Sequence, residues 1–173
     1  MNRLQEKYNK EILPALKEKF GYKNILAIPK IEKVVINVGT GKGLIDSKFN
    51  EAVENTLQRI TGQKPVKTLA KKSISNFKIR EGLVVGMAVT LRGRRMYDFI
   101  DKLVSVTFPR VRDFRGLDSK SIDHQGNLNL GFKEHIAFPE IESDEREKIH
   151  GLQISVTTTA KSKKEGLELL QLL

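Results

Sequence analysis

The hydrophobic periodicity of this chain changes repeatedly between about 3.6 and 2 residues, which restricts it to a fold that packs helices against strands. Helical spacing predicts four helices, at residues 3–20, from a cap at Asp46 or Ser47 to Gly62, at residues 95–106, and from Ser162 onward. Alternation predicts strands at residues 31–40, 65–70, 83–92, 127–132 and 151–160. We therefore expect an α+β fold, with helices packed on one face of an antiparallel sheet.

Proline residues indicate where the predicted helices bend or end. Pro14 is expected to kink or split the first helix, and Pro109 to mark the end of the third. Residues 110–140 read mostly as loop and irregular hairpin. Because no repeat or linker interrupts the chain, residues 1–173 are expected to form a single domain.

Each strand divides into an apolar face and a second face of small or polar residues. In residues 34–39 and 83–92, the second face includes Asn37, Thr90 and Arg92. An antiparallel sheet covered on one side leaves its other face in water, which by itself explains polar residues there. An ordinary solvated face, however, tends to carry Lys and Glu, whereas Gly, Ala, Thr, Asn and Ser let a large partner approach closely. We interpret this face as a docking surface.

The residue types on that face suit RNA. Asn37 and Thr90 can hydrogen-bond to sugar hydroxyls, base edges or phosphates, and Arg92 supplies charge at the rim. Gln63 and Lys64, in the turn after the second helix, would extend the same surface.

Charge points to a polyanionic partner. The chain has a net charge of +10, and residues 55–80 hold seven Lys or Arg with no Asp or Glu. Such a stretch is often only a solvated loop, but hydroxyl, amide and aromatic side chains within it favour RNA binding. In the loop at 71–82, the side chains expected to contact RNA are Lys71, Lys72, Ser73, Ser75, Asn76, Phe77, Lys78 and Arg80.

A membrane surface is a weaker candidate partner. No apolar run approaches the roughly 20 residues that a spanning helix needs, and the N-terminus lacks the apolar core of a signal peptide. Cysteine is absent, which excludes disulfides and thiolate metal sites. We expect a cytoplasmic protein.

Motifs for catalysis and metal binding are incomplete. GTGKG at residues 39–43 lies between a strand and a helix but lacks the Gly-Lys-Ser or Gly-Lys-Thr of a phosphate loop. The histidines, His124, His135 and His150, have no ligand spacing and are expected to be surface or structural residues. We expect no catalytic residue, metal or cofactor. The acidic segment at 139–147 is expected to be a solvated loop or a protein contact.

Several blocks resemble one family. VVINVGTGKG, TGQKPVKTLAKKSISNFKIREG, VGMAVTLRGRRMYDFIDKLV and FPRVRDFRGL are similar to bacterial large-subunit ribosomal protein five, as are GNLNLGFKEHIAFPEI and GLQISVTTTAKSKKEGLELL. The resemblance implies a protein without enzymatic activity that binds 5S rRNA and helps attach it to 23S rRNA in the central protuberance. Members usually continue past Leu173, so the last helix is expected to fray.

The resemblance also implies roles for individual residues. The 5S rRNA positions would be Asn37 in VVINVG, Gln63 in TGQKP and Thr90 in AVTLRG, with basic support from Lys64 and Arg92. The loop at 71–82 would contact the P-site transfer RNA. An intersubunit bridge to small-subunit protein thirteen would use Arg110, Arg112, Asp113, Arg115, Glu142, Asp144 and Glu145. Neighbouring 5S-associated ribosomal proteins would be further partners.

Two other functions remain open from the residues alone. A generic basic nucleic-acid-binding protein would bind any RNA or DNA of equal length with similar affinity. A phosphate-handling enzyme would use Lys42 of GTGKG and close the basic loop over an anionic substrate.

Overall fold

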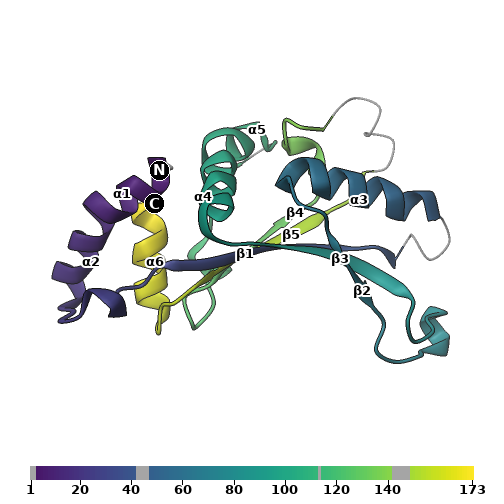
Figure 1. Ribbon diagram of the computed structural model, residues 1–173, viewed down its shortest axis with the longest axis horizontal. Helices are drawn as coiled ribbons and strands as arrows, with labels where there is room; N and C mark the ends of the chain where they lie inside the picture. Colours follow the sequence, from purple (N-terminus) through teal and green to yellow (C-terminus); the bar gives the residue numbers. More distant parts are fainter. Residues whose placement is uncertain (1–2, 42–46, 113, 142–148) are drawn as a thin grey trace. The chain divides into compact units, whose positions relative to one another are not determined.

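A computed structural model describes residues 3–41, 47–112, 114–141 and 149–173 of the chain (Figure 1). Its helices are α1 (Arg3–Lys7), α2 (Leu13–Phe20), α3 (Ser47–Thr61), α4 (Gly93–Lys102), α5 (Phe108–Arg110) and α6 (Lys163–Leu172). Its strands are β1 (Ile31–Gly39), β2 (Val66–Leu69), β3 (Val84–Leu91), β4 (Leu128–Phe132) and β5 (Leu152–Thr158). The strands form one sheet in the order β2-β3-β1-β5-β4. The prediction of an α+β fold, with helices packed on an antiparallel sheet, is confirmed.

The chain forms two compact units. The first comprises Met1–Val35, Leu91–Leu130 and Ile154–Leu173, and the second comprises Ile36–Thr90 and Gly131–Gln153. The first unit therefore contains α1, α2, α4, α5 and α6, and the second contains α3 and the β2–β3 hairpin. That residues 1–173 form a single domain stays a prediction. Within the described ranges, every helix is too short or too polar to cross a bilayer.

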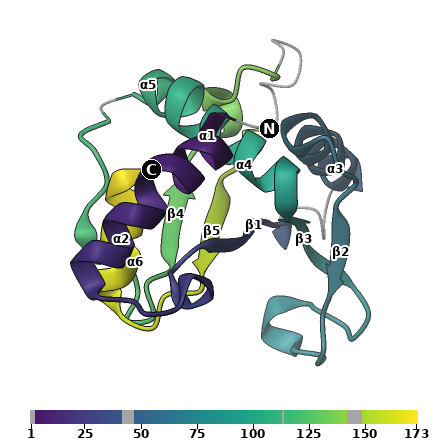
Figure 2. The same ribbon diagram turned by 60° about the vertical axis from the view of Figure 1, so that its left-hand side comes forward.

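The second unit is organised by α3, which lies beside β2 and β3 in both views (Figure 1, Figure 2). The apolar stripe that its periodicity predicts is buried, and consists of Phe49, Val53, Leu57 and Ile60. On β3, Met87 and Val89 are buried as the alternation predicts. This apolar layer fixes which face of the strands is left for a partner.

The first helix accommodates Pro14 through a change of hydrogen-bond register. A π-helical turn at Tyr8–Ile12 separates α1 from α2, and Pro14 is the second residue of α2. The Leu13 N–H donates to the Tyr8 carbonyl, five residues earlier. Because proline has no N–H to donate, it is best tolerated in the first turn of a helical segment. The expected split at Pro14 therefore takes the form of a π turn.

The helix that contains Pro109 ends one residue after it, at Arg110, so Pro109 lies at the helix end as the sequence predicts, although the helix reaches beyond Val106. A π-helical turn at Leu103–Thr107 follows α4, and Pro109 is the second residue of α5. The Phe108 N–H donates to the Leu103 carbonyl, again five residues earlier. The same register change therefore precedes each proline, and places it in a first turn where its missing N–H is tolerated.

In the first unit, α6 begins at a side-chain cap and packs closely on a loop. The Ser162 side chain accepts from the Glu165 N–H, and the Glu165 carboxylate accepts from the Lys161 N–H. One turn later, Gly166 meets Gly126, where a Cβ atom on Gly166 would overlap the Gly126 backbone. The two glycines therefore allow backbone-to-backbone packing.

Replacing Gly126 by Ala should lower the free energy of unfolding by about 2–4 kcal/mol. The new Cβ atom would lie 2.8 Å from Ala160 Cβ and 2.9 Å from the Ser162 carbonyl oxygen, at a φ of +84°. Chemical denaturation measures the change. Gly131→Ala is the control, because nothing lies within 4 Å of its Cβ position; equal losses in both variants would contradict the packing argument.

Candidate nucleic-acid interface

The second unit presents an open face on the side of β2 and β3 away from the buried Met87. In the antiparallel β2–β3 pair, Val66 is opposite Ala88 and Thr68 is opposite Gly86, so these residues point to one side. A Cβ atom built on Gly86 would lie 2.8 Å from Thr68 Oγ1 and 3.9 Å from Asn37 Oδ1. We call the surface formed by Asn37, Val66, Thr68, Ala88 and Thr90 the open face.

Thr90 extends the open face along β3. It follows Gly86 by four residues, so its side chain lies on the same side and about 13 Å further along the strand. Asn37 is exposed and Thr90 is half-buried. The predicted grouping of these two side chains on one face therefore agrees with the strand geometry.

Gly86 has a different role from the one that the sequence suggests. It is buried, and a Cβ atom there would lie 3.0 Å from the Val38 carbonyl oxygen as well as against Thr68. A small residue at this position is required by packing between strands, rather than by close approach of a partner.

Gln63 is positioned at the end of β3 by the turn that follows α3. Its side-chain Nε2 donates to the Thr90 carbonyl at 3.4 Å, and its own N–H donates to Thr61 Oγ1 at 3.2 Å. Gly62 ends the helix with a φ of +65°. The turn therefore brings Gln63 next to Thr90; that Gln63 extends the docking surface stays a prediction.

Lys64 is exposed, but Glu54 of α3 lies near its charge. The Lys64 Nζ is 3.8 Å from one Glu54 carboxylate oxygen, and the Lys67 Nζ is 3.1 Å from the other. Lys67 is opposite the buried Met87, so it belongs to the helix-covered side of the hairpin. The sequence analysis missed this pairing, which reduces the positive charge that two of the seven basic residues offer to a polyanion.

Arg92 belongs to the first unit, where it directly precedes α4 with an exposed side chain. Its backbone is extended, with φ of −137° and ψ of 164°, so it acts as the helix cap residue. The structure therefore assigns Arg92 to a different unit from Asn37, Gln63, Lys64 and Thr90.

The basic loop, residues 71–82, is a folded extension of the β2–β3 hairpin (Figure 2). Ala70 and Leu83 are hydrogen-bonded at its base, and Ile74 and Ile79 exchange both backbone hydrogen bonds, at 2.9 and 3.2 Å. All the side chains predicted to contact RNA are exposed: Lys71, Lys72, Ser73, Ser75, Asn76, Phe77, Lys78 and Arg80. Of these, Ser73 also works within the loop, because its Oγ accepts from the Glu81 N–H at 2.9 Å.

The predicted bridge residues are only partly described. Arg110, Arg112 and Arg115 are exposed, near Phe108 and Phe114, whose rings stack at 4.8 Å between centroids. Asp113, Glu142, Asp144 and Glu145 lie outside the described residues, as does Lys42 of the GTGKG segment.

Two of the three histidines form a buried pair in the second unit. The rings of His135 and His150 stack with 4.1 Å between centroids, and the Phe49 ring lies edge-on to His150. This confirms a structural role for both, whereas His124 is exposed. Among the residues that the structure describes, no group of three or more His, Cys, Asp or Glu could hold a metal ion.

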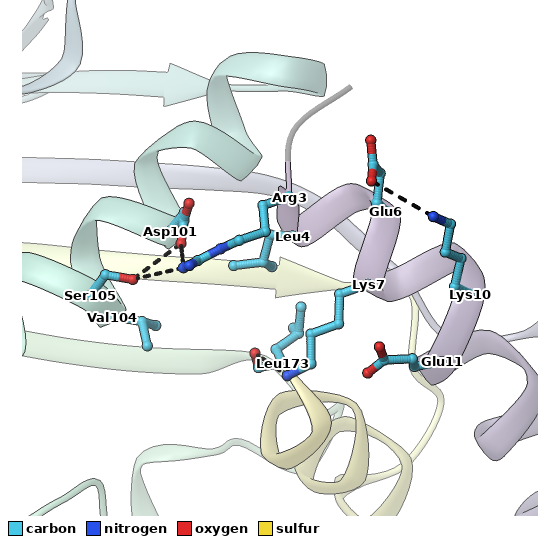
Figure 3. Close-up of a pocket in the computed structure, with 10 residues that line it drawn as sticks. All are labelled: Arg3, Leu4, Glu6, Lys7, Lys10, Glu11, Asp101, Val104, Ser105 and Leu173. Atoms are coloured by element: carbon cyan, nitrogen blue, oxygen red, sulfur yellow. Dashed lines mark hydrogen bonds and ion pairs between the residues drawn. The ribbon is translucent and has the colours of Figure 1, made fainter.

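A hollow in the first unit is lined by ion-paired and hydrogen-bonded side chains (Figure 3). It lies among α1, the helical segment around Asp101 and Ser105, and Leu173. The Arg3 Nη2 donates to the Asp101 carboxylate at 2.6 Å and to Ser105 Oγ at 3.1 Å. The lining contains no His that could activate Ser105 as a nucleophile.

Sequence reasoning missed Val66 and Thr68 on the open face. Val66 is 68% exposed although it is a β-branched apolar residue in a strand. The signal was available in the alternation of residues 66–69, once β2 is aligned with β3 so that Thr68 meets Gly86.

Comparison with known proteins gives the family. Residues 24–80 match the family model described as ribosomal protein L5, and residues 84–173 match the model for the C-terminus of the same ribosomal family. The chain is 54% identical to the large ribosomal subunit protein uL5 of Halothermothrix orenii, 56% identical to that of Clostridium perfringens and 55% identical to that of Caldanaerobacter subterraneus. Each match covers 100% of this chain and 97% of the relative. The chain belongs to the L5 family of large-subunit ribosomal proteins.

Proposed function

We propose that this chain binds 5S rRNA through the open face and Gln63, and helps to attach it to 23S rRNA. The observation that carries the proposal is the placement of Asn37, Gln63 and Thr90 in one unit, around β1 and β3, with Asn37 exposed. Amide and hydroxyl groups on a strand surface suit the sugars, phosphates and unpaired bases of a folded RNA. Lys64, and Arg92 from the first unit, would add attraction for phosphates.

We further propose two contacts outside the open face. The basic loop would reach the P-site transfer RNA, supported by its exposed Lys and Arg side chains. The segment with Arg110, Arg112 and Arg115, together with the acidic loop at 139–147, would form the bridge to protein thirteen of the small subunit. Neighbouring 5S-associated ribosomal proteins would complete the set of partners.

Family membership decides which of the alternative functions remain. As a large-subunit ribosomal protein, the chain is a structural component of the cytoplasmic ribosome and not an enzyme. The phosphate-handling alternative is therefore excluded. A generic nucleic-acid binder is the alternative that an experiment must separate from the proposed function.

The purified chain should bind 5S rRNA in preference to an unrelated folded RNA of equal length, and the preference should persist at higher salt. Phosphate contacts release counterions, so both affinities should fall as salt rises, whereas contacts that depend on RNA shape are retained. A competition titration at two salt concentrations measures this. Equal binding of both RNAs, lost together at higher salt, would indicate a generic basic surface.

Asn37→Ala should weaken 5S rRNA binding about tenfold while leaving the unfolding transition unchanged, because one polar contact is removed from an exposed position. Asn55→Ala is the matched control, since Asn55 is an exposed asparagine of α3 in the same unit. The same titration measures both variants. Wild-type affinity in Asn37→Ala, or equal weakening in both, would show that the open face is not the 5S rRNA site.

Glu54→Gln should strengthen RNA binding about two- to fivefold at low salt and steepen its salt dependence. The amide is neutral, so Lys64 and Lys67 lose the carboxylate that lies within 4 Å of each Nζ. The titration is repeated at several salt concentrations. Glu51→Gln is the control, because it removes the same charge from an exposed residue of α3; an equal gain there would mean that only net charge matters.

A further inference from the structure

Phe77 is exposed at the tip of the basic loop. It ends a 3-10 turn, Ser75–Phe77, and 67% of its surface is accessible. The loop's other large apolar side chain near the tip, Ile74, is 45% exposed. Single exposed apolar side chains are common on protein surfaces, so it is the position of Phe77 among exposed cationic side chains that makes it a candidate contact residue.

The backbone around Phe77 is held in a fixed shape. The Ile74–Ile79 bridge closes the tip, the Lys78 N–H donates to the Ser75 carbonyl at 2.9 Å, and Ser73 accepts from Glu81. Lys78 has a φ of +54°, and within the described ranges it is the only residue other than glycine with a positive φ. A lysine in this region is strained, and the flanking hydrogen bonds hold it there. The ring is therefore presented on a preformed turn.

The surroundings of the ring select the class of partner. Lys71, Lys72, Lys78 and Arg80 are all exposed, and Glu81 is the one acidic residue of the loop. Cationic side chains around an exposed aromatic ring suit a ligand that is anionic and has flat π faces, and single-stranded nucleic acid has both properties. An apolar pocket in a protein would use the ring but not the charges.

We propose that Phe77 is a stacking platform for an unpaired nucleobase of the transfer RNA that the basic loop contacts. This rests on the proposed function, which assigns the loop to transfer RNA. Stacking uses the face of the ring and is tolerant of base identity, while the lysines hold the neighbouring phosphates. Because the turn is already folded, binding does not have to order it.

The stacking is tested with single strands and a tryptophan reporter. The chain contains no Trp, so Phe77→Trp introduces one fluorophore at the site. The probes are a short end-labelled oligoadenylate and an abasic strand of equal length and charge, at low salt, with binding followed by label anisotropy. Oligoadenylate should quench the Trp emission, whereas the bound abasic strand should not.

Affinity for the two strands tests the role of the ring. The wild-type chain and Phe77→Trp should prefer oligoadenylate about tenfold, and Phe77→Ala and Phe77→Leu should lose that preference. Leu keeps apolar bulk without a π face, so retained preference in Phe77→Leu would point to simple apolar contact and overturn the proposal. No preference in the wild-type chain, or unchanged Trp emission with oligoadenylate bound, would also overturn it.

Adding 5S rRNA and transfer RNA one after the other tests which of the two supplies the stacked base. Phe77→Trp is first saturated with 5S rRNA and then titrated with transfer RNA; quenching is expected only at the second step. Quenching at the first step would overturn the assignment to transfer RNA. The outcomes separate the two proposals, because selective 5S rRNA binding tests the open face and does not depend on Phe77.

Discussion

The alternation of buried and exposed side chains along β1 and β3 is the constraint on which the rest of the structure depends. Val38 and Met87 are fully buried on one side, and this forces Asn37 to the other side. A slip of one residue in register would bury the amide of Asn37 and expose Val38. The close approach of Thr68 and the Val38 carbonyl to Gly86 leaves no room for a side chain there, so it helps to define how β1, β3 and β2 lie together. The polar groups of the open face are therefore a consequence of the core behind them.

Sequence patterns predict those features that depend on one element at a time. The period of α3 predicts its buried stripe, and alternation predicts that Asn37 and Thr90 face away from the core. Features that depend on two segments were not accessible in this way. The contact of Glu54 with Lys64 and Lys67 requires knowing that α3 lies beside β2, and the stacked His135 and His150 are fifteen residues apart.

The prolines show a different limit of sequence reasoning. A proline inside a helical pattern normally indicates an end or a kink, because it lacks an N–H and its ring crowds the preceding turn. Here a π turn ends two residues before each of Pro14 and Pro109; the helix then runs on to Phe20 after Pro14 but ends at Arg110 after Pro109. Tyr8 and Ile12 are buried in one π turn, and Leu103 and Thr107 in the other. Packing therefore supports the register shift at both sites.

Positive charge on and beside the β2–β3 hairpin occurs in two structural settings. Lys64 and Lys67 lie near the Glu54 carboxylate on the second unit, whereas the lysines of the basic loop project from a turn held by backbone hydrogen bonds. The first setting keeps charge close to the fold and moderates its attraction for RNA. The second places charge on a preformed turn, where little conformational entropy is lost when a partner binds. A protein with a net charge of +10 is attracted to any polyanion, so discrimination between RNAs depends on rigid, directional groups. In the proposed 5S rRNA site the amide of Asn37 would be such a group, because the paired strand β1 presents it. Stacking on Phe77 would instead add affinity on a preformed turn without selecting one base.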